Sequence, residues 1–171
     1  MPPNAEMYSN NPVDFEIIPL SAAHRSWVRE FITTRWGAPE IVVHDERFLP
    51  ETLPGCLAVI AAVPAGLITW NIIGDTCEII SLDSLQPHRG IGSALLAAAE
   101  TAARSAGCKT CCLVTTNDNI QAQRFYTNRG YYVTHIDLGA VNRARILKPA
   151  IPFVNGEGVP ITDEITFVKT L

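Results

Sequence analysis

The stretch EIISLDSLQPHRGIGSALLAAAE, from Glu78 to Glu100, limits what this chain can fold into more than any other part of the sequence. An apolar run leads into a turn that contains Gly90 and Gly92, and an alanine-rich run follows. This order predicts a strand, a tight turn and a helix. A helix that opens at such a turn presents free backbone N–H groups and the positive end of its dipole. The turn is therefore predicted to bind a phosphate.

The chain has 171 residues, a length that predicts one domain, and 47% of them are hydrophobic against 18% charged, which is typical of a globular fold. We expect a disordered tail over residues 1–12 and a single domain over residues 13–171. A formal net charge of −4 argues against a nucleic-acid partner, because such partners require clustered basic residues. The sequence has neither an apolar run of about 20 residues nor a signal peptide, which predicts a cytoplasmic protein that does not bind membranes.

The apolar patterns predict a mixed α/β fold. A first strand over DFEIIPL is followed by a helix from Ser21 to Gly37, and residues 38–55 read as a binding loop with at most a short element. Three apolar runs, separated by PA and by GDT, predict an antiparallel meander. The helix from Ser93 to Ala106 and the strand KTCCLVTT then form a crossover, so the sheet becomes parallel there. A short helix and two strands complete the chain, with a long connection at residues 139–162 that contains a helical turn from Ala140 to Leu147.

The cysteines do not indicate a metal or redox site. Cys108 and Cys111 form a C-x-x-C pair, but Cys108 follows the end of a helix, whereas a redox thiol is activated at a helix N-terminus. The sequence shows no second ligand pair for zinc, and its histidines are scattered singly. Buried, reduced cysteines and no bound metal are the prediction.

Two common phosphate loops fit this turn poorly. A P-loop requires G-x-x-x-x-G-K-[ST], and neither that spacing nor the lysine occurs around Gly90. The dinucleotide fingerprint requires a third glycine where this chain has Leu95, and it normally lies in the first crossover of a parallel sheet. Nucleoside triphosphates are thus disfavoured, and a dinucleotide is a second choice.

Two motifs in sequence order resemble the GCN5-related N-acetyltransferase (GNAT) superfamily. That family has a Q/R-x-x-G-x-G/A turn after its fourth strand and an N-x-x-A-x-x-x-Y segment after its fifth. Here these are PHRGIGSALL and NIQAQRFYTNRGY, with Pro87 where the family has Gln or Arg. The resemblance implies a single domain with a mostly antiparallel mixed sheet, a strand–helix–strand crossover and flanking helices.

The resemblance also implies acetyl-coenzyme A as the cosubstrate. Backbone N–H groups from His88 to Ser93 would hold its pyrophosphate, and the backbone of Ser84 and Leu85 would pair with its pantetheine arm. The residues involved would be Ser84, Leu85, His88, Arg89, Gly90, Ile91, Gly92, Ser93, Asn119 and Tyr126. Asn119 is equally suited to capping the helix that it opens, and Arg89 to remaining solvated.

Amine acetylation needs a base for the ammonium and an acid for the departing thiolate. Tyr126 stands where the family has its usual general acid, although a half-buried core tyrosine is the alternative. Glu78 and Asp83 are the candidate bases, and each could instead be an ordinary strand carboxylate.

The sequence therefore predicts an N-acetyltransferase in which a primary amine attacks acetyl-CoA directly, with a non-catalytic acyl-CoA sensor as the alternative. The acceptor would be a small molecule or a peptide, with residues 38–55 and 139–162 shaping its site. A homodimer is a further expectation from the family.

Overall fold

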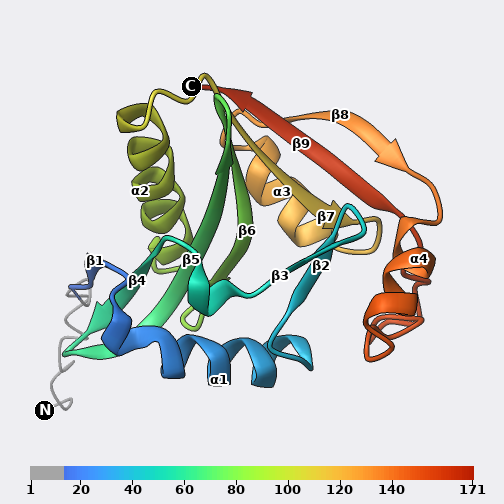
Figure 1. The fold of residues 1–171 in the computed structure, drawn as a ribbon, viewed down its shortest axis with the longest axis horizontal. Coiled ribbons are helices and arrows are strands. Elements are labelled where there is room, and N and C mark those ends of the chain that lie inside the picture. The colour runs from blue at the N-terminus through green and yellow to red at the C-terminus, as the bar shows by residue number, and fades with distance from the viewer. Residues whose placement is uncertain (1–13) are drawn as a thin grey trace, which may run out of the picture.

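The computed structural model describes residues 14–171, so the tail predicted over residues 1–12 lies outside the described part (Figure 1). The first half of the chain contains β1 (Glu16–Pro19), a 3₁₀ turn (Ala22–His24), α1 (Arg25–Trp36), β2 (Ile41–Val43), β3 (Glu46–Phe48), a second 3₁₀ turn (Pro50–Thr52), β4 (Gly55–Ile60), β5 (Val63–Ile73) and β6 (Thr76–Ser84). The second half contains α2 (Ile91–Ser105), β7 (Thr110–Thr116), α3 (Ile120–Thr127), β8 (Tyr132–Asp137), α4 (Ala140–Leu147) and β9 (Glu164–Thr170).

Seven strands form one sheet in the order β1-β4-β5-β6-β7-β9-β8. Among these pairs only β6 and β7 are parallel, and α2 connects them as the predicted crossover. All other neighbours in this sheet are antiparallel. The mixed α/β fold with a mostly antiparallel sheet is thus confirmed.

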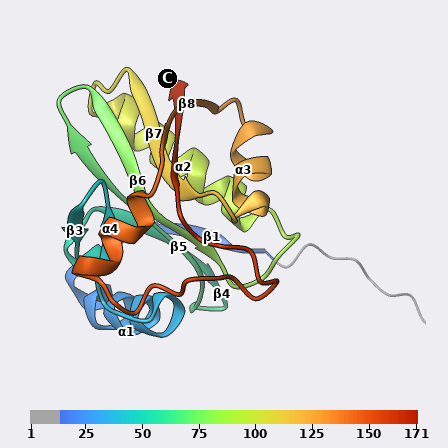
Figure 2. The same ribbon diagram turned by 90° about the vertical axis from the view of Figure 1, so that its right-hand side faces the viewer.

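Two apolar cores lie on opposite faces of the sheet (Figures 1 and 2). On one face α2 and α3 pack through residues such as Leu95, Ala99 and Tyr126. On the other face Val28 and Ile32 of α1 pack with Leu67 and with residues of the small β2–β3 hairpin. The central strands of the sheet are therefore covered on both sides, whereas β8 at its edge is largely exposed.

The turn between β4 and β5 differs from the predicted one. Pro64 and Ala65 lie inside β5, and the chain reverses at Ala61 and Ala62, whose φ angles are +49° and +64°. A two-residue hairpin whose central residues both have positive φ matches the twist of its strands, and that geometry determines the turn even without glycine. The PA dipeptide is a misleading turn signal here, because proline is tolerated in a strand where no ladder N–H is needed.

Residues 38–55 are more ordered than the predicted loop. They contain the two-stranded sheet β2–β3, which turns at His44 and Asp45 with φ angles of +52° and +59°. His and Asp belong to the small group of residues that adopt this left-handed conformation with some frequency. The sequence signal for the hairpin was therefore present, but each strand is only three residues long.

The predicted helical turn in the long connection is α4, and buried Arg145 organises the segment around it. Its guanidinium donates to the carbonyl oxygens of Ile151 (3.2 Å), Pro152 (2.6 Å) and Ile161 (2.7 Å). One buried cation thus holds together carbonyl groups that would otherwise lack partners.

Candidate functional site

The turn between β6 and α2 carries a row of free donors. In the described part of the chain, the six backbone N–H groups from His88 to Ser93 have no hydrogen-bond acceptor, and the first such bond of the helix runs from Ala94 to Gly90 (3.0 Å). His88 has a φ of +64° and Gly90 one of +79°. Left-handed residues of this kind turn successive N–H groups toward one side, which creates a concave binding site for an anion.

The two glycines of the turn have different roles. Gly90 supplies the left-handed φ angle, and a Cβ atom on it would meet nothing within 4 Å. Gly92 lies close to α3, because its Cβ atom would sit 3.4 Å from the ring of Phe125. The first glycine therefore shapes the turn, and the second allows α3 to pack beside it.

Arg129 is a residue at this site that the sequence analysis missed. Its guanidinium lies 3.6 Å from the centroid of the Phe125 ring and donates to the Phe125 carbonyl oxygen (2.7 Å) and to Ser93 Oγ (2.5 Å). A cation at a helix N-terminus is unfavourable unless an anion accompanies it. Arg89, the expected phosphate partner, is exposed and donates to the side chain of Gln86 within the same turn.

The parallel strands β6 and β7 separate beside this turn. Their pairing runs from Thr76 and Thr110 to Ile79 and Leu113, and it ends there although both strands continue. The N–H of Leu85 donates to the carbonyl oxygen of Ala65 on β5 (2.9 Å), so this group is not free for a ligand. Because successive residues of a strand point their backbone groups to opposite edges, Ser84 directs its own toward the gap.

Tyr126 lies deep in the core, with 7% of its surface exposed, and packs against the rings of Phe125 and Tyr131. Its hydroxyl makes no hydrogen bond within residues 14–171. Burial, together with the negative charge of Asp83, raises the pKa of this phenol. Asn119 acts as the helix cap of α3, since its Oδ1 accepts from the N–H of Ala122 (3.1 Å).

A β-bulge places the two candidate bases on the same face of the sheet. Strand alternation alone would put Glu78 and Asp83 on opposite faces. The pairing with β5 skips Ile80, however, because Thr69 faces Ser81 and Trp70 faces Ile79. Glu78 and Asp83 therefore both point to the face that α1 and the hairpin cover, in line with the frequent occurrence of bulges next to active sites.

The two carboxylates have different surroundings. Both oxygens of Asp83 are engaged by α1, one by Arg35 Nε (3.2 Å) and the other by the indole Nε1 of Trp36 (3.1 Å). Glu78 is equally buried, at 8% exposure, but its Oε1 has no hydrogen bond of normal geometry within the described residues. The Nε2 atom of His44 lies 3.1 Å from that oxygen, at ion-pair distance. Of the two, Glu78 is the carboxylate whose oxygen is not already held by donors of α1.

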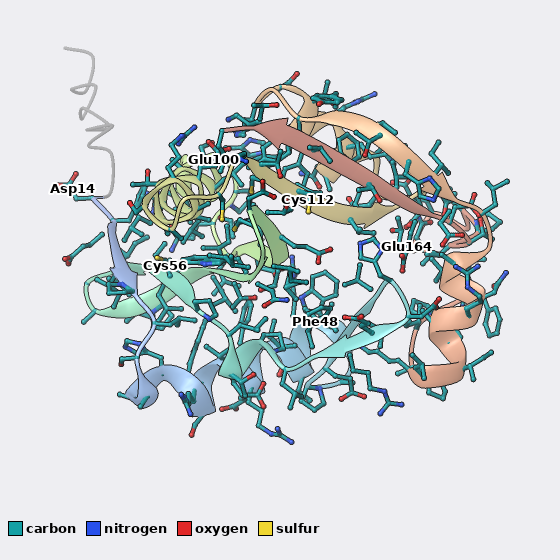
Figure 3. The ribbon with its side chains drawn as sticks, turned by 45° about the horizontal axis from the view of Figure 1, so that its top comes forward. Asp14, Phe48, Cys56, Glu100, Cys112 and Glu164 are labelled. Carbon is teal, nitrogen blue, oxygen red and sulfur yellow. The ribbon has the colours of Figure 1, made fainter. Side chains whose placement is uncertain are left out.

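His44 and Glu164 complete this cluster and were also missed from the sequence. Glu164 opens β9, and its Oε2 accepts from the backbone N–H of His44 (3.3 Å). Figure 3 shows Phe48, Cys112 and Glu164 bordering the same region, between the hairpin and the part of the sheet formed by β7 and β9. These residues come from elements far apart in sequence, so local patterns could not connect them.

Most of the cysteines lie in or next to the apolar core. Cys108 and Cys111 of the C-x-x-C pair are buried in the core beside α2, and all five cysteines are free thiols. Cys112 is next to Glu78 across the strand pair, and burial raises the pKa of its thiol to about 12. Residues 14–171 contain no group of three or more His, Cys, Asp or Glu side chains placed to hold a metal ion. They also contain no helix long and apolar enough to cross a membrane.

Comparison with known proteins defines the class. The family model of the acetyltransferase (GNAT) family matches residues 21–131. The uncharacterized protein YdhI of Bacillus subtilis (strain 168) is 42% identical over 156 residues, which cover 91% of this chain and 98% of YdhI. The chain therefore belongs to the GNAT acetyltransferase family, and the prediction from its two motifs is confirmed.

Solved structures show the same fold. The IAA acetyltransferase from Bacillus cereus ATCC 14579 superposes with a TM-score of 0.70 at 16% identity, over 92% of this chain and 100% of that one. A GNAT family acetyltransferase from Elizabethkingia anophelis with acetyl-CoA bound has a TM-score of 0.64 at 18% identity, over 92% and 98% of the two chains. At this level of identity the similarity establishes the fold alone.

Proposed function

We propose that this protein is an acetyl-CoA-dependent N-acetyltransferase that acetylates a primary amine in a ternary complex. One observation carries the proposal: six successive backbone N–H groups have no acceptor in the described structure, and they lie in the turn that follows β6, whose pairing with β7 has already ended. Such a turn suits the pyrophosphate of coenzyme A, and the gap suits its pantetheine arm, whose amides can satisfy backbone groups of β6. The acetyl-CoA bound by the Elizabethkingia relative supports this choice of cofactor.

The positions of the candidate catalytic groups support direct transfer. Glu78, with its available buried oxygen, would take a proton from the acceptor ammonium, whose pKa is about 10.4 in a free alkylamine. The neutral amine would attack the thioester carbon, and the C–S bond would break as the tetrahedral intermediate collapses. Tyr126 would donate a hydrogen bond to the departing sulfur and then its proton, and the second proton of the amine nitrogen, released as the amide forms, would return to the Tyr126 phenolate. The raised pKa of Tyr126 keeps its hydroxyl protonated until that charge develops.

Binding of the cofactor is tested first. Saturating acetyl-CoA should raise the melting temperature, and so should CoA, because each binds the folded state. At a hundredfold excess over the dissociation constant the gain is about 2.7 kcal/mol. A shift with NAD or ATP alone would contradict the assignment of the turn.

Catalysis is tested with Tyr126→Phe, compared with Tyr132→Phe on the exposed strand β8. Turnover with a panel of amines should fall about 10²-fold or more in the first variant, while acetyl-CoA affinity and the activity of the second remain at wild-type values. A wild-type protein that binds acetyl-CoA but acetylates no amine would favour the non-catalytic sensor. Unchanged turnover in Tyr126→Phe would remove Tyr126 from the mechanism.

A further inference from the structure

His44 stands between two carboxylates that belong to different strands. Its Nε2 atom lies 3.1 Å from Glu78 Oε1, and its Nδ1 atom lies 4.0 Å from Glu164 Oε2. Glu78 belongs to β6 and Glu164 to β9, while His44 forms the tip of the β2–β3 hairpin. The imidazole therefore joins the side chain proposed as the base to a second acid across the sheet.

The hairpin is fixed in this position by contacts with the α4 segment. Arg143 Nε lies 3.4 Å from Asp45 Oδ2, and Arg47 donates to the carbonyl oxygen of Leu147 (2.7 Å). Lys148 Nζ donates to the carbonyl oxygen of Glu40 (2.8 Å). Together with the backbone bond from His44 to Glu164, these contacts hold the ring against the carboxylates.

Exposure gives the three groups different access to water. The side chains of Glu78 and Glu164 are 11% and 7% exposed, whereas that of His44 is 48% exposed. The Glu78 side chain therefore has little contact with solvent, while the imidazole lies beside Glu78 and is half exposed. His is also the side chain whose ordinary pKa best suits proton exchange near neutral pH.

The charges around the ring are mostly negative. Contact with Glu78 raises the pKa of His44, partial burial opposes this, and the charges of Glu164 and Glu46 add to the increase. The titratable and charged groups facing this cluster are Glu78 on β6, Glu164 on β9, Glu46 on β3, Cys112 on β7, Asp137 on β8 beside Glu164, Asp45 at the hairpin tip, and Arg143 of α4 through Asp45 and Asp137. The imidazolium is thus stabilised by the carboxylates beside it.

We propose that His44 is the relay residue that carries the acceptor's proton from Glu78 to solvent. This inference rests on the proposed function. The ammonium gives one proton to the Glu78 carboxylate, and the resulting carboxylic acid passes it to Nε2 of neutral His44. The imidazolium beside Glu164 then releases its Nδ1 proton to water, and proton exchange of the half-exposed ring with solvent returns it to the Nδ1–H tautomer, which restores both groups for the next turnover.

The test variant is His44→Asn, because asparagine also tolerates the left-handed φ of +52° at this position and so preserves the turn. His135→Asn on exposed strand β8 is the matched control. We expect kcat/KM for the amine at pH near 7 to fall at least 10-fold in His44→Asn, with unchanged acetyl-CoA affinity. Imidazole added to the buffer should restore part of the lost rate.

The pH dependence gives a second readout. His44 must be neutral to accept a proton, so the acidic limb of the kcat/KM profile should move to lower pH in His44→Asn. The His44 pKa measured by NMR should decrease in Glu78→Gln, with or without an acceptor.

The outcomes separate this inference from the proposed function. Wild-type rates in His44→Asn, or a loss that imidazole does not restore and that leaves the pH profile in place, would overturn the relay alone. A wild-type protein that acetylates no amine would overturn the proposed function and the relay with it.

Discussion

Gly90 combines a φ of +79° with open space around its Cβ position, so that Gly90→Ala adds backbone strain without a steric clash. A left-handed conformation costs an L-residue about 1–2 kcal/mol, and alanine offsets roughly 0.4–1 kcal/mol by restricting the unfolded chain. We expect the free energy of unfolding to decrease by about 1 kcal/mol if the turn keeps its shape.

The turn could also change shape and relieve the strain, and the N–H groups would then be misplaced for the pyrophosphate. Stability would be preserved in that case, but acetyl-CoA affinity would fall. The free energy of unfolding measured at saturating acetyl-CoA reports both effects, the backbone strain and the weaker binding, because the binding free energy adds to the stability of the folded state. With saturating acetyl-CoA we therefore expect the free energy of unfolding of Gly90→Ala to be about 1 kcal/mol lower than that of the wild type, whether the turn is strained or reshaped. This corresponds to about 2–4 °C in Tm.

Two other substitutions make the measurement specific. Gly107, just after α2, also has open space and a φ of +83°, so Gly107→Ala should cost similar stability and leave the acetyl-CoA dissociation constant unchanged. Gly90→Asn should lower the free energy of unfolding less than Gly90→Ala does, because asparagine tolerates the left-handed region. If Gly90→Ala matched the wild type in both stability and affinity, the turn would not need this backbone conformation, and the argument for its shape would be refuted.

Three further predictions concern stability. Ala62→Gly should raise the urea midpoint, because glycine adopts a positive φ without strain. The same change at exposed Ala97 inside α2 should lower the midpoint, by about 1 kcal/mol of unfolding free energy. A decrease of the midpoint in both variants would contradict the turn geometry. His44→Asn should be less stable than the wild type below pH ~6.5, where the wild-type imidazole with its raised pKa is protonated, and this difference should vanish as pH rises through the folded-state pKa. Urea midpoints of both proteins from about pH 5 to 9 would show this. A difference in midpoint that does not change with pH would contradict it. Tyr131→Phe removes the hydroxyl that donates to buried Glu100 (3.0 Å), and it should lower the free energy of unfolding in urea by about 1.5–3 kcal/mol. A Tyr131→Phe protein as stable as the wild type would contradict this prediction.

Much of the fold follows from local patterns. The helix predicted from Ser21 to Gly37 is present, but its first residues form a 3₁₀ turn capped by Ser21, so that α1 begins at Arg25 and ends at Gly37 with a φ of +79°. The turn at Ala61 and Ala62 could not be located in this way, because alanine carries no turn signal and the nearby proline does. The chain reverses there in two residues, and the twist of the paired strands β4 and β5 determines where it does so. Strand pairing is a tertiary constraint that a local pattern does not contain.

The two halves of the candidate site differ in how far they can be predicted, and the reason is physical. The turn between β6 and α2, proposed to bind the pyrophosphate, consists of consecutive backbone groups from His88 to Ser93, so a short motif specifies it. The acceptor side requires a bulge at Ile80, which the sequence does not mark, before Glu78 can share a face with Asp83. It also requires His44 and Glu164, which only the assembled sheet and hairpin bring within contact. A short segment can thus specify a backbone site, while the side chains proposed to act on the acceptor come together only in the whole fold, which would allow one cofactor site to serve different acceptors.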